Sequence, residues 1–275
     1  RHMAKYADIP AIFSQEAPAD TDGAWDNQYP RVVFAIDTQG DVERGVAGTL
    51  LMDVMTEKEG ELAPEDIEPI VRNLIDGYFF SNPQITIAAQ WDTSRYFTEP
   101  TEKVIGVTMN FRLLEFPPQT TCDPDPIALL NEWTANELPK IIGIESVRVI
   151  GRDSLPSAWK PTDEQPAVFW RLGNISSSSL IPDTYSCIWQ TAHVYGHIMA
   201  KTSATETIIE RTINSSLTLA KRLIFEDLAP LMLDAIRHNP TNDPLRNGQI
   251  ELDSTYGILN PQLNQGQRLG KILIK

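Results

Sequence analysis

The order of secondary-structure elements expected from this sequence occurs twice, and this repetition most limits the folds open to the chain. The first copy consists of two strands, a helix and two strands, at 30–36, 48–56, 64–80, 85–91 and 103–116. The second copy has the same order, at 166–172, 184–200, 205–225, 249–256 and 268–275. The sequence therefore predicts an α+β protein of two similar small domains, each a mostly antiparallel sheet packed against one or two helices.

A proline-rich segment separates the two copies. Residues 117–126 hold four prolines, which neither a helix interior nor a central strand accepts. We therefore expect a first domain at 1–117, a semi-rigid linker at 118–126 and a second domain at 127–275. The first domain includes an extended amino-terminal arm over 4–28.

Local signals set the expected ends of several elements. A helix over 64–76 has Pro64 in its first turn, and Gly77 follows as its stop. Asp125 is the expected cap of a second helix that ends at Pro139, and Thr205 is the expected cap of the helix in the second copy. The glycine-rich stretch 37–48 predicts an exposed hairpin tip, and 228–238 predicts a further turn or short helix.

Charge and composition exclude several classes of function. The formal net charge is −14, from 37 acidic and 23 basic residues, so most of the surface repels a nucleic-acid backbone. No stretch reaches the roughly 18 consecutive apolar residues of a membrane-spanning helix, so we expect no membrane partner. Two cysteines, Cys122 and Cys187, are too few for a disulfide framework, which favours a reducing compartment.

Two histidines, His193 and His197, are the strongest candidates for chemistry. At a spacing of four they would share one metal ion on a helix, but residues 185–198 alternate between apolar and polar as a strand does. On a strand their rings lie about 13 Å apart, too far for one ion. We therefore favour a solvated or interface-facing strand face over a metal site.

Other catalytic patterns are missing from the sequence. It has no nucleophile elbow and no phosphate-binding glycine loop, and the serine run 176–179 is typical of a turn. Asp123 and Asp125 have calcium-like spacing, but prolines surround them and no bidentate Glu follows. We expect no catalytic, cofactor-binding or metal site, and a protein whose work is assembly.

Three features of the first copy form a recognisable pattern: residues 9–18 leading into the strand at 29–36, the helix end at 70–75 and the long strand at 104–113. In this pattern the first copy resembles the tail-terminator and tail-completion (neck) proteins of long-tailed bacteriophages. The resemblance covers about 100 residues, and the second half matches only in element order. The chain departs from that pattern in lacking a leading helix before residue 30 and in being doubled.

The resemblance implies a structural protein of a phage or phage-like tail. In that family an α+β subunit forms a ring, commonly of six, that caps the tail tube at its head-proximal end and meets the connector. The implied partners are further copies of this chain and other tail or connector proteins, with DNA only as passing cargo in a lumen. The implied location is the virion, after assembly in the cytoplasm of the bacterial host.

Two other functions stay open on the sequence. One is a hydrolase that uses His193, His197 and a carboxylate from the opposite copy. The other is a bacterial interaction module unrelated to phage. If the doubling is real, three chains would supply six similar lobes for a ring.

Overall fold

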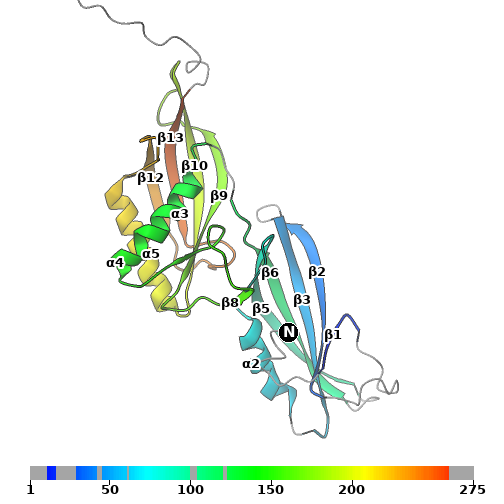
Figure 1. Ribbon diagram of the computed structural model, residues 1–275. Coiled ribbons are helices and arrows are strands. Elements are labelled where there is room, and N and C mark those ends of the chain that lie inside the picture. The colour runs from blue at the N-terminus through cyan, green and yellow to red at the C-terminus, as the bar shows by residue number, and fades with distance from the viewer. Residues whose placement is uncertain are drawn as a thin grey trace, which may run out of the picture. The chain divides into compact units, whose positions relative to one another are not determined.

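The computed structural model describes residues 11–16, 29–41, 45–60, 62–99, 104–119 and 123–259, which form two compact units. The first unit contains the described residues up to Pro118 together with Asp153–Pro161. The second contains Gln119–Arg152 and the described residues from Thr162 onward. Each unit combines a mostly antiparallel sheet with helical structure, one described helix in the first unit and three in the second, so the expected α+β class with two similar units is confirmed (Figure 1).

The sheet of the first unit has seven strands in the order β1-β2-β3-β6-β5-β4-β8. The strands are β1 (Ala11–Ser14), β2 (Arg31–Asp41), β3 (Gly45–Glu57), β4 (Phe79–Ser81), β5 (Thr86–Glu99), β6 (Val104–Glu115) and β8 (Ala158–Trp159). Helix α2 (Pro64–Ile75) begins with a proline, and its buried apolar residues recur every four positions along the side that contacts β3, β5 and β6.

The sheet of the second unit has six strands in the order β11-β12-β13-β10-β9-β7. The strands are β7 (Arg148–Val149), β9 (Ala167–Ser177), β10 (Cys187–Met199), β11 (Arg222–Ile224), β12 (Pro230–His238) and β13 (Ile250–Leu259). Three helices accompany it: α3 (Pro126–Asn136), α4 (Leu138–Ile142) and α5 (Ser203–Ala220). The Asp125 carboxylate caps α3 by accepting from the N–H groups of Ile127 and Ala128.

The two sheets share one topology. Counted from its β7 edge, the second sheet runs β7-β9-β10-β13-β12-β11, which matches β1-β2-β3-β6-β5-β4 of the first, strand for strand. In both, the first strand of the series pairs in parallel with the second, and the remaining pairs of the series are antiparallel. In both, the long helix follows the hairpin formed by the second and third strands.

The match extends to single residues on the two long helices. The buried residues of α2 that pack on the sheet each lie 142 positions before a buried counterpart of α5: Ile67 and Ile209, Glu68 and Glu210, Val71 and Ile213, Ile75 and Leu217. Each of the two buried glutamates contacts a polar side chain of one strand in its own unit, and these two strands, β5 and β12, are equivalent in the two sheets. Glu68 accepts a hydrogen bond from Ser94 of β5 at 2.7 Å, and Glu210 lies 2.7 Å from Nδ1 of His238 of β12.

A β-bulge also occurs at equivalent places. Asp92 is the extra residue of β5 opposite β6, and Asp234 is the extra residue of β12 opposite β13. Each carboxylate accepts a hydrogen bond from the neighbouring strand, Asp92 from Arg112 at 2.5 Å and Asp234 from Thr255 at 2.6 Å. Because bulges fix strand register and twist, a shared bulge shows that the two sheets are built in the same way.

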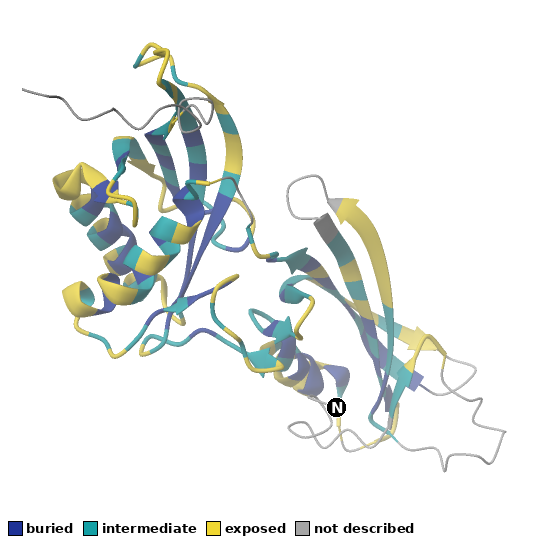
Figure 2. Ribbon diagram, turned by 45° about the horizontal axis from the view of Figure 1, so that its top comes forward, coloured by how far each residue is buried: buried dark blue, intermediate teal, exposed yellow. Residues whose placement is uncertain are grey.

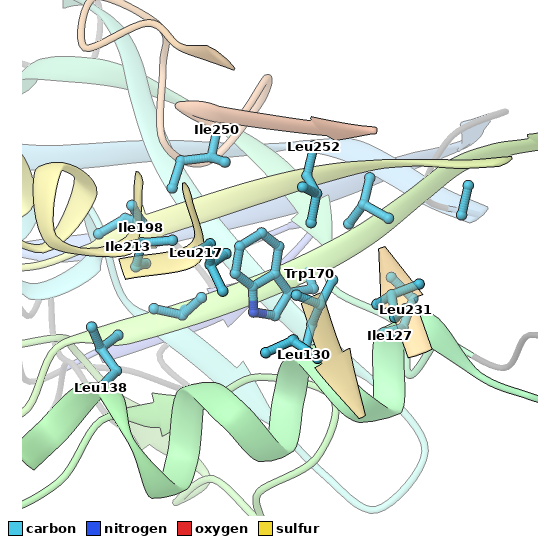
Figure 3. Packing of buried hydrophobic residues seen from close by; sticks show 14 of the residues in the cluster. Ile127, Leu130, Leu138, Trp170, Ile198, Ile213, Leu217, Leu231, Ile250 and Leu252 are labelled. Atoms are coloured by element: carbon cyan, nitrogen blue, oxygen red, sulfur yellow. The ribbon is translucent and has the colours of Figure 1, made fainter. Parts of the chain in front are cut away.

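The core of each unit lies between the helices and one face of its sheet (Figure 2). In the second unit Trp170 of β9 lies at the centre, with apolar side chains from the strands on one side and from α3 and α5 around it (Figure 3). The indole N–H donates to the Thr134 hydroxyl at 2.8 Å, and that hydroxyl donates to the Leu130 carbonyl at 2.7 Å. The one polar atom of this large ring is therefore paired inside the core.

The structure differs from the expected domain limits. Residues 153–161 fall inside the expected second domain but belong to the first unit, since β8 pairs with β4. The expected linker over 118–126 is split: Pro118 belongs to the first unit, and Gln119 and Asp125 belong to the second. Gln119 accepts a hydrogen bond from the N–H of Leu172 at 3.1 Å, which ties the start of this segment to β9.

Several element predictions were wrong. The helix expected to reach 225 ends at Ala220, because Lys221 adopts the left-handed conformation (φ 60°), and β11 follows. Its cap is Thr202 rather than Thr205, and the turn or short helix expected over 228–238 is β12.

The amino-terminal half has differences of the same kind. Part of the expected arm forms β1. The helix expected over 64–76 is confirmed, since α2 ends at Ile75 with Asp76 as its C-cap, but the end of the helical stretch expected to reach residue 80 belongs to β4. The expected exposed hairpin between the first two strands is present, with residues 37–40 exposed, but its strands extend farther into 37–48 than expected, pairing from Asp37 opposite Thr49 to Asp41 opposite Gly45. Gly48 permits this close pairing, because a Cβ there would collide with the Asp37 carbonyl oxygen. The expected strand at 268–275 lies outside the described residues.

We predict that Thr134→Val destabilises the second unit by about 1–3 kcal/mol, because it leaves the buried indole N–H of Trp170 without an acceptor. Urea unfolding followed by tryptophan fluorescence measures this loss. Thr134→Ser keeps the hydroxyl and is the matched control, with a smaller loss expected. In a Trp170→Phe background the valine substitution should cost less, and an equal cost in both backgrounds would contradict the assigned role of this hydrogen bond.

Candidate functional site

The two candidate histidines lie on β10 and on the same face of it, as the alternating pattern predicts. Their environments differ. His193 is partly exposed, with a side-chain exposure of 24%, whereas His197 is fully buried. The expectation of a solvated or interface-facing strand face is therefore wrong at His197, because the segment between β12 and β13 covers it. Nδ1 of His197 lies 2.8 Å from the Pro244 carbonyl oxygen of that segment.

His193 belongs to a polar cluster on three neighbouring strands. Its Nδ1 lies 2.5 Å from Oδ1 of Asp253, its direct partner on β13. Arg237 of β12 donates from Nη2 to the other oxygen of Asp253 at 2.8 Å and from Nε to Glu251 at 3.4 Å. Asp253 therefore accepts one hydrogen bond on each oxygen, from side chains that lie on either side of β13.

The charge state of Asp253 follows from these contacts. Burial alone favours the neutral carboxyl group, but the hydrogen bonds and positive charge that His193 and Arg237 supply outweigh it and lower the pKa of Asp253. The group is thus an anion near neutral pH and acts as an acceptor only, so Nδ1 of His193 carries the proton. This orients the imidazole with Nε2 away from Asp253.

Aromatic side chains extend the cluster toward β9. The ring of Tyr195 meets that of His193 edge-on at 4.8 Å, and the guanidinium of Arg171 lies 4.4 Å from the centre of the Tyr195 ring. These side chains occupy the sheet face opposite the helices, because Ala192 and Val194, which alternate with them, lie in the core with α3 and α5. The face is thus a row of paired polar and aromatic groups.

A hydrolytic centre would need a nucleophile or a metal beside His193. In the part of the chain that the structure describes, the imidazole of His193 hydrogen-bonds to Asp253, and no hydroxyl or thiol group hydrogen-bonds to it. The carboxylate comes from the same unit and not from the opposite one. No cluster of three or more metal-binding side chains occurs among the described residues.

The other residues singled out by the sequence do not join this cluster. Cys187 begins β10, and burial together with Asp183 raises the pKa of its thiol, which does not suit a nucleophile. Ser176 lies in β9, next to the turn expected there, and Asp125 is the cap of α3. Cys122 lies outside the described residues.

Partly uncovered strand edges are a second functional feature. Among the described strands, β1 pairs with Arg31–Phe34 of β2, and the remainder of β2 has β3 as its one partner. In the same part of the chain, β11 pairs with Pro230–Met232 of β12, which leaves the outer edge of its second half without a strand. Such edges offer backbone groups to a further strand.

Comparisons with protein-family models, curated proteins and solved structures return no match for this chain. Among the described residues, no helix is long and apolar enough to cross a lipid bilayer.

The pairing of His193 with Asp253 and Arg237 could not be found by sequence reasoning alone. Both partners lie more than forty residues from His193, and only the cross-strand register brings them together. The available signal was alternation at His193, which lies between buried Ala192 and Val194. Asp253 lies between buried Leu252 and Ser254, and Arg237 has no buried neighbour in its strand.

We predict that Asp253→Asn lowers the free energy of unfolding of the second unit at pH 7 by about 1 kcal/mol, a figure reduced for partial solvent exposure. Because folding lowers the pKa of Asp253, its contribution is complete above the unfolded value of about 3.9 and disappears as the pH falls through the folded value. Urea unfolding at a series of pH values measures the difference. Glu145→Gln, at an exposed acid, is the control, and a difference that persists unchanged at pH 2 would contradict this account.

Proposed function

We propose that this protein is a structural or assembly protein of a phage or phage-like tail, which joins or caps the tail tube at its head-proximal end as part of a ring. The observation that carries the proposal is the repeated unit, with one strand order, one helix position and one bulge in both halves. A chain that contains the same scaffold twice carries equivalent strand edges twice. Such repeated edges suit closed assemblies, in which like interfaces recur around an axis.

The resemblance of the first half to tail-terminator proteins supports this choice of assembly. In that family single α+β subunits form rings, commonly of six. Three chains with two units each supply the same number of units. The proposed ring is therefore a trimer of this chain, with pseudo-sixfold character.

Edges and charge agree with the proposal. The outer part of β2 carries Ile36, which is 56% exposed, next to backbone groups that a further strand can pair with. A neighbouring copy would cover both. The net charge of −14 suits a lumen through which DNA passes without adhering, because like charges repel. The assembly would reside in the virion.

A hydrolase is the second candidate, and the short contact between His193 and Asp253 favours it. Against it, His197 is buried with Nδ1 at a main-chain carbonyl, and a nucleophile beside His193 is missing from the described residues. The assembly proposal needs neither group. A hydrolase screen with His193→Ala as control tests the enzyme directly.

We predict that native mass spectrometry finds a species of three times the 30.8-kDa chain mass, and that negative-stain micrographs of it show rings. Ile36→Lys, which places a charge at the open edge of β2, should shift the population toward monomer. Ile208→Lys is the matched control, since Ile208 is similarly exposed (59%) on α5, away from any strand edge. A monomer at every concentration, without rings on the grid, would rule the ring out.

A further inference from the structure

A two-part groove lies on the second unit, where β10 begins, β13 ends and the chain turns from β11 to β12. One part has a volume of about 470 Å³ and is lined by Cys187, Trp189 and residues 227–230, with the end of β13. The other part has about 450 Å³ and lies along α3 and residues 224–227. The two parts share Asp123, Pro124 and Asp227. Volumes of this order accept several side chains.

The groove is acidic and apolar at the same time. Its lining includes five carboxylates and no lysine or arginine: Asp123, Asp125, Glu132, Glu226 and Asp227. Three large apolar side chains of the lining are open to solvent, Leu228 at 80%, Leu259 at 65% and Ile224 at 44% exposure. An exposed apolar patch with a polar rim is typical of a binding surface.

The backbone conformation of Leu228 is unusual for a bulky residue. Its φ is +69°, in the left-handed region that bulky residues avoid, and its N–H donates to the Phe225 carbonyl at 2.9 Å. The chain therefore accepts backbone strain at a turn that holds a leucine out toward solvent. Strain of this kind persists where the surrounding structure imposes it, and it is common at binding sites.

The segment that follows β13 has the complementary chemistry. Residues 260–275 contain Arg268, Lys271 and Lys275 and no acidic residue, in a chain with a net charge of −14. Leu269 and 272–274 are apolar. This segment also has no counterpart in the repeated unit, because β13 is the equivalent of β6 and completes the six-strand series.

We propose that residues 268–275 dock in the acidic groove of the second unit of their own chain. Their apolar side chains cover Leu228 and Leu259, and their basic groups face the carboxylates. The spacer over 260–267 starts at Leu259, which itself lines the groove, and eight residues span up to about 28 Å. So short a tether gives an effective concentration in about the millimolar range, which favours the chain's own segment over that of a neighbour.

Disulfide trapping in the full chain tests this docking. Leu273→Cys is introduced with Cys122→Ser, so that Cys187 in the groove is the one native partner. Oxidation is run at mildly alkaline pH, because burial and Asp183 raise the pKa of the Cys187 thiol. We expect an intrachain disulfide that forms about tenfold faster than one from Gln265→Cys in the same background, as a docking preference of about 1.4 kcal/mol gives. If the segment met the groove only by random collision, the disulfide would form faster from position 265, which is joined to the groove by the shorter tether.

Charge variants distinguish docking of the segment in the groove from mere proximity through the tether, because only docking depends on the carboxylates of the groove. Asp123→Asn with Asp227→Asn should slow trapping from position 273 and leave position 265 unchanged, and high salt should act in the same direction. Glu145→Gln with Glu164→Gln removes two acids that do not line the groove and should leave both rates unchanged. Equal rates from the two positions overturn the proposal. Disulfide-linked dimers as the main product at low protein concentration also overturn it, since the occupant is then the segment of a second copy.

Discussion

Both units depend on the same packing constraint: one helix must place apolar residues, four positions apart, on the middle strands of a sheet. In α2 these are Ile67, Val71 and Ile75, and in α5 they are Ile209, Ile213 and Leu217. A helix turns about 100° per residue, so this spacing gives a single narrow stripe that fits only one rotation of the helix against the sheet. The fixed rotation carries Glu68 and Glu210 into buried positions, where strand side chains must satisfy their oxygens. The equivalent strands and bulges follow from holding this geometry twice.

The order of elements could be predicted because burial leaves a period in the sequence, and the main errors occur where that period is interrupted. In β12 the extra residue Asp234 shifts the alternation of its neighbours, so the strand resembled a turn or short helix. The end of α5 carried no signal, since Lys221 takes the left-handed position that glycine usually marks. Gly40, Gly45 and Gly48 indicated a loop, yet all three lie in paired strands. Residues 153–161 join the first unit through two strand residues, too short a segment for a pattern.

The polar cluster around His193 was partly predictable. Alternation placed His193 and His197 on one strand face and excluded a shared metal, and both positions depend on local backbone geometry alone. Asp253 and Arg237 depend on the register of three strands, which long-range pairing determines. The burial of His197 depends on a connection between β12 and β13 that local pattern does not place.

The two units differ on the sheet faces that point away from the helices. Through the matched registers, Leu51 and Asn110 of the first sheet stand where His193 and Asp253 stand in the second, on the faces away from the helices. The buried positions of α2 and α5 keep their chemistry, while these outer positions change from apolar and amide groups to an ion-paired cluster. Packing explains why the buried helix positions are kept, because substitutions in a close-packed interface cost stability. Packing places no such demand on the outer positions, so the outer faces are free to differ. In the proposed ring, two kinds of outer face would let one scaffold meet two different neighbours.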